Sequence, residues 1–185
     1  MQIIGGLYRR RRLKGPPSLR TRPTARRLRE TLFNILAPAI EGARFLDLCA
    51  GSGAVGIEAL SRGAAFVTFV DRSRKMCAII EENLDLCRVP EEQSEVVLDE
   101  ASDFLRRAAR GAEGWDIIFF DPPYAVEYQP TLELFGAPGS TLLREDGVLI
   151  VEHYHKKLLP ETLGQIRRWR LLKQGETCLS FYEHG

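Results

Sequence analysis

Short apolar runs alternate with apolar stripes at helical spacing along most of the chain. The runs are typical of strands, and the stripes between them are typical of helices. Strand-like runs cover residues 44–48, 66–70, 96–98, 116–120 and 148–151. Helical patterns cover residues 55–60, 73–86, 101–110 and 131–135. Strands that alternate with helices predict an α/β fold with a mostly parallel sheet covered on both faces.

The two ends of the chain depart from this alternation. Residues 166–172 and 177–182 predict a closing hairpin, which gives the sheet an antiparallel C-terminal strand. At the other end, Ile3-Ile4-Gly5-Gly6 predicts two short strands around a glycine turn, and an amphipathic helix begins near Thr24 as its N-cap and ends before Pro38. At 185 residues we expect a single domain, with an extension (residues 1–40) and an α/β body (residues 41–185).

Charge is distributed unevenly, although the net charge is only +1. The first 30 residues carry ten of the 26 Lys and Arg residues and one of the 25 acidic residues, so their net charge is +9 and that of the remainder is −8. A basic segment ahead of an acidic body indicates a docking surface for a polyanion. The candidate contacts to this polyanion, which would be RNA under the resemblance given below, are Arg9, Arg10, Arg11, Arg12, Lys14, Arg22, Arg26 and Arg27.

Composition argues against several other classes of protein. No apolar run approaches the roughly 20 residues of a membrane-spanning helix, and the start of the chain does not have the order of a secretory signal. The four cysteines form no C-x-x-C pair and there are three histidines, so we expect no metal site. Cysteines used as small buried apolar residues fit a reducing, cytoplasmic location.

A glycine-rich loop follows the first predicted strand of the body. Gly51-x-Gly53-x-x-Gly56 lies between Asp47 in that strand and Asp71 at the end of the next one. This spacing matches the dinucleotide fingerprint, in which the second acid binds ribose hydroxyls, so NAD and S-adenosylmethionine compete as cofactors. Asp47 would repel a pyrophosphate but could hold a cation, which favours S-adenosylmethionine. The remaining candidate cofactor contacts are Ala50, Ser52, Arg72, Glu100 and Ala101.

A rigid tetrapeptide, Asp121-Pro122-Pro123-Tyr124, follows the fourth predicted strand. Its prolines fix the backbone and remove two donors, which leaves an edge rich in hydrogen-bond acceptors. The Asp121 carboxylate and the Pro122 carbonyl could accept the N–H groups of an exocyclic base amine and aim its lone pair at a methyl donor. Tyr124 could stack on the base. Such alignment supplies most of the catalysis in an in-line displacement.

These motifs together resemble the class I S-adenosylmethionine-dependent methyltransferases that methylate amines. The segment from Arg22-Pro23-Thr24 to Leu36 resembles the signature of the bacterial 16S ribosomal RNA guanine-966-N2 methyltransferases, and Ile3 to Gly6, Leu46 to Gly53, residues 121–124 and Val151-Glu152-His153 agree in order and spacing. The resemblance implies a Rossmann-like fold, S-adenosylmethionine as cofactor and 16S ribosomal RNA or a small-subunit particle as partner. It also implies that the segment around Thr24 closes over the cofactor, while Asp121 replaces an Asn common in relatives.

Three other functions stay open from the sequence alone. The tetrapeptide is also compatible with a DNA adenine-N6 methyltransferase, although the chain has no obvious extra segment for reading a duplex. The glycine loop is compatible with an NAD-dependent oxidoreductase. The basic extension alone would suit a non-catalytic RNA-binding module.

Overall fold

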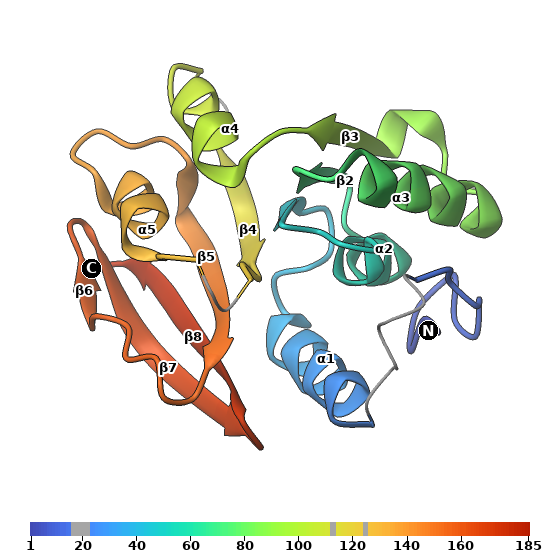
Figure 1. The fold of residues 1–185 in the computed structure, drawn as a ribbon, viewed down its shortest axis with the longest axis horizontal. Helices are drawn as coiled ribbons and strands as arrows, with labels where there is room; N and C mark the ends of the chain where they lie inside the picture. The colour runs from blue at the N-terminus through green and yellow to red at the C-terminus, as the bar shows by residue number, and fades with distance from the viewer. Residues whose placement is uncertain (16–22, 112–113, 124–125) are drawn as a thin grey trace.

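The computed structural model describes residues 1–15, 23–111, 114–123 and 126–185 of the chain, without the side chains of residues 23–25. In this part of the chain, eight strands form one sheet in the order β3-β2-β1-β4-β5-β8-β7-β6 (Figure 1). The strands are β1 (Arg44–Leu48), β2 (Phe66–Asp71), β3 (Ser94–Leu98), β4 (Trp115–Phe120), β5 (Leu143–Tyr154), β6 (Thr162–Leu163), β7 (Ile166–Gln174) and β8 (Thr177–His184). The helices are α1 (Pro23–Leu36), α2 (Ala54–Ser61), α3 (Arg74–Cys87), α4 (Ala101–Ala108) and α5 (Gln129–Gly136), with a 3-10 turn η1 (Glu91–Gln93).

The sheet has the predicted mixture of strand directions. Strands β1 to β5 pair in parallel, and β8 runs antiparallel to both β5 and β7. The fifth strand is longer than residues 148–151, because a shift in register lets Leu143 pair with Trp115 beyond an exposed stretch of β5. The two-residue strand β6 was not predicted, since two residues carry no readable alternation.

Two apolar cores lie on opposite faces of this sheet. On one face, α1, α2 and α3 bury Leu32, Ile57 and Ile80 among others. On the other face, α4 and α5 bury Leu105 and Leu132. Figure 1 shows α4 and α5 on one side of the sheet and the first three helices on the other. Alternate residues of each strand serve the two cores, as expected for a parallel sheet covered on both faces.

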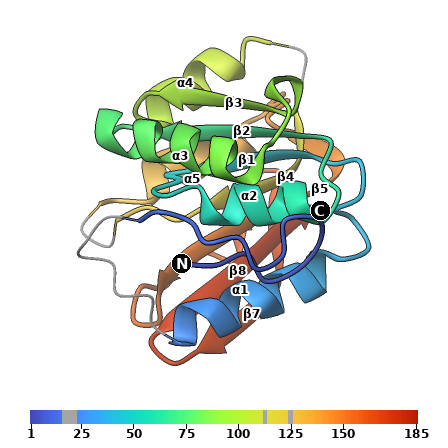
Figure 2. The same ribbon diagram turned by 90° about the vertical axis from the view of Figure 1, so that its right-hand side faces the viewer.

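The extension differs in two details from its prediction. Helix α1 begins at Pro23, so Thr24 lies in its first turn and is not its N-cap; proline suits this position because its missing N–H would have no partner there. The two expected strands are reduced to one antiparallel bridge between Gln2 and Arg12. The turn between them bonds to α2 instead, through Leu7 N to Ser61 O at 2.7 Å and Tyr8 N to Ser61 Oγ at 2.8 Å (Figure 2).

A buried carboxylate on α2 joins the extension to the body. Glu58 has no exposed surface, and its two oxygens accept the backbone N–H groups of Ile4 and Gly5, each at 2.8 Å. Arg62 donates to the same carboxylate at 2.9 Å, and Arg29 of α1 lies 3.7 Å from it. Arg29 also donates to Gln2 O at 2.6 Å. One carboxylate therefore holds the N-terminal segment, α1 and α2 together.

Replacing Glu58 with alanine should lower the free energy of unfolding by about 3–5 kcal/mol, because it leaves two backbone donors and two guanidinium groups without their buried acceptor. Urea denaturation measures this change. The control is Glu82→Ala, which removes an exposed carboxylate 3.0 Å from Lys14 and should cost less than about 1 kcal/mol. Equal losses for the two variants would contradict the anchoring role of Glu58.

Candidate functional site

The loop from β1 to α2 turns through three residues in the left-handed region. Cys49, Gly51 and Gly53 have φ of 65°, 56° and 74°. A Cβ on Gly51 would meet nothing within 4 Å, so this glycine leaves its backbone open to a ligand. A Cβ on Gly56 would lie 2.3 Å from the Phe69 ring, so this glycine lets α2 pack directly on β2. Gly51 thus keeps the backbone of the loop accessible, and Gly56 allows the close packing of α2 on β2.

Asp71 holds the loop from the end of β2. Its carboxylate accepts the backbone N–H of Gly51 and that of Ser73, both at 2.8 Å. The carboxylate is partly exposed and borders the cavity described below. Each oxygen keeps a further lone pair, so the group can still accept hydrogen bonds from a ligand's hydroxyls.

Asp47 lies beneath the loop and is almost completely buried. Its Oδ2 accepts the N–H of Gly56 in the first turn of α2 at 2.8 Å. Burial, above all, raises the pKa of Asp47 to about 8; the bond from Gly56 opposes this shift, and the carboxylates of Asp121 and Asp71 contribute to it. The structure thus keeps an ionisable acid in a position where its charge is strongly disfavoured.

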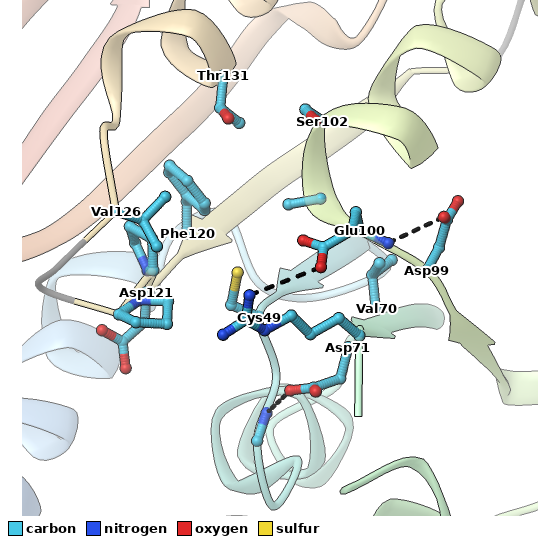
Figure 3. Close-up of a pocket in the computed structure, with 15 residues that line it drawn as sticks. Cys49, Val70, Asp71, Asp99, Glu100, Ser102, Phe120, Asp121, Val126 and Thr131 are labelled. Atoms are coloured by element: carbon cyan, nitrogen blue, oxygen red, sulfur yellow. Dashed lines mark hydrogen bonds and ion pairs between the residues drawn. The ribbon is translucent and has the colours of Figure 1, made fainter. Parts of the chain in front are cut away.

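A cavity of about 300 Å³ lies at the carboxyl ends of the strands, between the glycine loop, α4 and the segment after β4 (Figure 3). Four of its lining residues are acids: Asp71, Asp99, Glu100 and Asp121. The lining contains one arginine, Arg72, whose Nη1 lies 3.6 Å from Oε1 of Glu100. Its other lining residues are Cys49, Gly51, Val70, Ala101, Ser102, Phe120, Pro122, Pro123, Val126 and Thr131.

The acids around the cavity affect the pKa of the Cys49 thiol, which is part of the lining. Burial, together with the carboxylates of Asp121, Asp71, Asp47 and Glu100, raises the pKa of Cys49 to about 12. Such a field repels a pyrophosphate and attracts a cation. The lining therefore suits a positively charged ligand with an apolar part that packs on Val70, Ala101 and Phe120.

Five of the predicted cofactor contacts line this cavity, namely Gly51, Asp71, Arg72, Glu100 and Ala101. Asp47, Ala50, Ser52 and Gly53 lie in or beneath the loop and are not part of the lining. Ser52 is buried, and its carbonyl accepts a bond from Asn83 at 2.9 Å. The side chain of Thr24 lies outside the described residues.

The segment after β4 forms a fixed corner beside the loop. The N–H of Asp121 donates to Leu48 O of β1 at 3.2 Å, so the ends of the two strands are bonded to each other. The Pro122 carbonyl accepts the Tyr128 hydroxyl at 3.3 Å, and the Pro123 carbonyl accepts Val126 N at 3.0 Å. Tyr124 lies outside the described residues. The carbonyls of Pro122 and Pro123 thus each already accept one bond within the chain.

The Asp121 carboxylate points away from the other labelled side chains of the cavity (Figure 3). Phe120 packs in the core beneath α4 and α5, so the next residue turns toward the opposite face of the sheet. Burial raises the pKa of Asp121 to about 7. This acid therefore borders the cavity with its backbone and presents a poorly solvated carboxylate on the side of the sheet that α1 covers.

Several cavity and support residues were missed from the sequence. The missed lining residues include Cys49, Val70, Asp99, Phe120 and Thr131. The first four share one signal that could have found them, which is their place at the end of a strand. Asn83 of α3 and Tyr128 support the site through Ser52 and Pro122, respectively. Nothing local marks these two, because their partners lie on other elements.

The predicted RNA contacts are spread over the extension. Arg9, Arg10, Arg11 and Arg12 are all exposed, and so are Arg26 and Arg27 on α1. Lys14 is also exposed, and it is tied to α3 by its N–H, which donates to Asn83 Oδ1 at 2.7 Å, and by its ion pair with Glu82. Arg22 lies outside the described residues.

Two further findings concern the described part of the chain. It contains no helix long and apolar enough to cross a membrane. It also contains no group of three or more His, Cys, Asp or Glu side chains placed to hold a metal ion.

Fold and cavity together define a Rossmann-like α/β protein of the class I methyltransferase type. The family model described as "Conserved hypothetical protein 95" matches residues 1–183, and the chain belongs to this family. It is 44% identical over 184 residues to "Ribosomal RNA small subunit methyltransferase D" of Escherichia coli (strain K12), a match covering 99% of this chain and 89% of that protein.

Two more relatives agree. The protein of the same name from Haemophilus influenzae is 35% identical over 185 residues, with 98% of this chain and 91% of that protein covered. The solved structure described as "Putative methyltransferase yhhF from Escherichia coli" superposes with a TM-score of 0.84 at 34% identity and covers 100% of this chain and 97% of that one. The resemblance seen in the sequence is therefore confirmed at the level of family and fold.

The raised pKa of Asp47 predicts how stability depends on pH. Because the folded-state pKa lies near 8, above the usual value of about 4, the free energy of unfolding should fall as the pH rises through this interval. Asp47→Asn keeps an acceptor for Gly56 but does not titrate, so its advantage over the wild type should grow with pH, by at most about 1.4 kcal/mol per unit. Urea denaturation between pH 5 and pH 8 measures both proteins. Parallel curves would contradict the shift.

Proposed function

We propose that this protein transfers a methyl group from S-adenosylmethionine to the N2 amine of a guanine in 16S ribosomal RNA. The observation that carries the proposal is an acidic cavity placed between the glycine loop of β1 and the Asp121-Pro122-Pro123 corner of the adjacent strand β4. The family membership also supports the proposal, because relatives that match nearly the whole chain are named as ribosomal RNA small-subunit methyltransferases.

The donor set of the cavity fits the proposed cofactor. S-adenosylmethionine carries a sulfonium and an ammonium group and no phosphate, and it supplies an electrophilic methyl group when bound. Asp71 would accept bonds from its ribose hydroxyls, and the open backbone at Gly51 would let it approach the loop closely. Val70, Ala101 and Phe120 would pack on the adenine. Asp47, Ala50, Ser52, Gly53, Arg72, Glu100 and Thr24 remain predicted contacts or supports.

The corner would grip the target amine. The Asp121 carboxylate accepts one N–H of the amine, and the Pro122 carbonyl, which keeps one lone pair beside the Tyr128 hydroxyl, accepts the other. These bonds aim the nitrogen lone pair at the methyl donor, which is a contribution of positioning. Transfer of the methyl group from the sulfonium sulfur to the nitrogen would release one proton from the amine, and the ionised Asp121 carboxylate would accept it. Stacking by Tyr124 remains a prediction.

The basic extension would bind the RNA. Phosphate contacts from Arg and Lys supply affinity without sequence information, and a target base must leave its stack to reach Asp121. We assign this role to the exposed Arg9, Arg10, Arg11, Arg12, Lys14, Arg26 and Arg27, together with Arg22. Residues 1–40 would then dock the substrate and residues 41–185 would catalyse, within one domain. Ribosomal RNA or a small-subunit particle as substrate implies a cytoplasmic enzyme.

The direct test incubates the purified protein with labelled S-adenosylmethionine and small-subunit ribosomal RNA, both naked and assembled, and maps the modified base by mass spectrometry. We expect one N2-methylguanine. Transfer to adenine in plasmid DNA instead would support the DNA methyltransferase alternative. Calorimetric binding of NAD but not S-adenosylmethionine would support the oxidoreductase, and RNA binding without turnover would support the non-catalytic module.

Asp121→Ala should lower turnover by at least about 100-fold, since it removes the acceptor that aligns the amine. Cofactor affinity should change little, because the carboxylate points away from the other cavity side chains. Single-turnover methylation and isothermal calorimetry with S-adenosylmethionine measure the two effects. A parallel loss of cofactor binding would show that the role of Asp121 has been misassigned.

The pKa of Asp121 near 7 also predicts a pH dependence of activity. The ionised carboxylate would accept the N–H bond and the proton of the amine, whereas protonation turns one oxygen into a donor, so the rate should fall as the pH drops below about 7. Asp121→Asn keeps a neutral acceptor at all pH values, and its rate profile should be flatter over the same range. Rate profiles between pH 5.5 and pH 8.5 compare the two proteins. Identical profiles would remove Asp121 as the titrating group.

A further inference from the structure

A second carboxylate lies beside Asp121 at the end of the next strand. Strands β4 and β5 pair in parallel with Phe120 opposite Val151, so Asp121 and Glu152 follow at the same level. Phe120 and Val151 both belong to the core beneath α4 and α5, so both acids turn toward the opposite face. Leu179, which pairs with Glu152 across β8, lies in the core on that opposite face. The two carboxylates therefore share one side of the sheet.

Neither carboxylate has a neutralising partner in the part of the chain that the structure describes. Among the residues that the structure describes, no side chain or backbone N–H donates a hydrogen bond to the carboxylate of Asp121 or of Glu152, and no cation forms an ion pair with either. Burial raises the pKa of Glu152 well above its usual range, and the charge of Asp121 raises it further. Desolvated acids without partners are costly to a folded protein. Both are partly exposed, so a ligand can reach them.

The neighbouring polar side chain has a partner of its own. His153 is buried, and its Nε2 lies 2.9 Å from Ser180 Oγ on β8. Within the segment Val151-Glu152-His153, the glutamate is thus the group left available for a ligand.

Two acids at the same level of adjacent strands can reach two donors on the edge of one purine. Adjacent strands lie roughly 4.8 Å apart. Guanine presents its N2 amine and its N1–H as donors side by side, whereas adenine presents an amine beside N1 as an acceptor. Two ionised carboxylates, a state that N–H donors favour, can bind both guanine donors, but the second would meet a lone pair on adenine. This pair of acids therefore discriminates between the two bases, which the segment 121–124 alone does not.

We infer that Glu152 is a specificity-determining residue that accepts the N1–H of the target guanine while Asp121 holds its N2 amine. This inference rests on the proposed function and extends it to the choice of base. The observation behind it is the placement of Glu152 level with Asp121, on the same face of adjacent strands.

The test reverses the hydrogen bond by changing both partners. The base exchanges its N1–H donor for an acceptor, and Glu152 is exchanged for a side chain that can donate. Once the methylated guanine is mapped, a small-subunit RNA is prepared by ligation with 2-aminopurine at that position, which keeps the 2-amino group and lacks the proton on N1. Wild-type protein should methylate guanine at least about tenfold faster than 2-aminopurine. Glu152→Gln should lose about 10- to 100-fold on guanine and should match or exceed the wild type on 2-aminopurine, because its amide can donate to N1.

Glu145→Gln is the matched control, since Glu145 is an exposed acid on the same strand, and its ratio of rates should equal that of the wild type. Thermal unfolding and calorimetry with S-adenosylmethionine verify that each variant is folded and binds the cofactor. An unchanged guanine rate for Glu152→Gln, or equal losses on both bases, would overturn the inference. A wild-type protein that methylates no guanine would instead overturn the proposed function.

Discussion

The pairing of β1 with both β2 and β4 is the constraint on which the site depends. Parallel strands place their carboxyl ends at one edge of the sheet, so the loop after β1 and the corner after β4 become neighbours. The bond from Asp121 N to Leu48 O fixes their separation. The connections leave this point in opposite directions, because α2 crosses one face of the sheet while α4 and α5 cover the other. A crevice at such a switch point is the usual ligand site of an open α/β sheet.

Charge distinguishes this crevice from a dinucleotide site built on the same motif. A glycine loop followed by an acid at the end of β2 occurs with either type of cofactor. Here the acids of the lining outnumber its single arginine, and Asp47 and Asp121 both have pKa values raised by burial. Burial favours the neutral form of these two acids, and a cationic ligand would restore their charge. The acidic field therefore argues for a cationic cofactor more strongly than the glycine spacing argues for either one.

The sequence predicted the features that are set by local pattern. Residues 44–48 form β1 as expected, and Asp71 and Asp121 lie at strand ends because an apolar run followed by a polar break marks such a point. The contacts of Glu58 could not be read in this way, because Ile4 and Gly5 approach it from more than 50 positions away. The support that Asn83 gives to the loop could not be predicted either, because Asn83 and Ser52 are 31 positions apart in the sequence. Glu152 was visible as part of a motif, but its place level with Asp121 required the register of β4 and β5.

Helix α2 connects the two halves of the proposed activity. Its first turn is held at the glycine loop by Asp47 through Gly56 N, and its last turn holds the extension through Glu58 and Ser61. Eight helical residues span roughly 12 Å, so the exposed arginines that follow Tyr8 are fixed at a short distance from the cofactor loop. A docking segment attached by a flexible linker would leave this distance undefined. The buried Glu58 thus gives the extension a fixed position, and under the proposed function this basic surface would bind phosphates at a defined distance from Asp121.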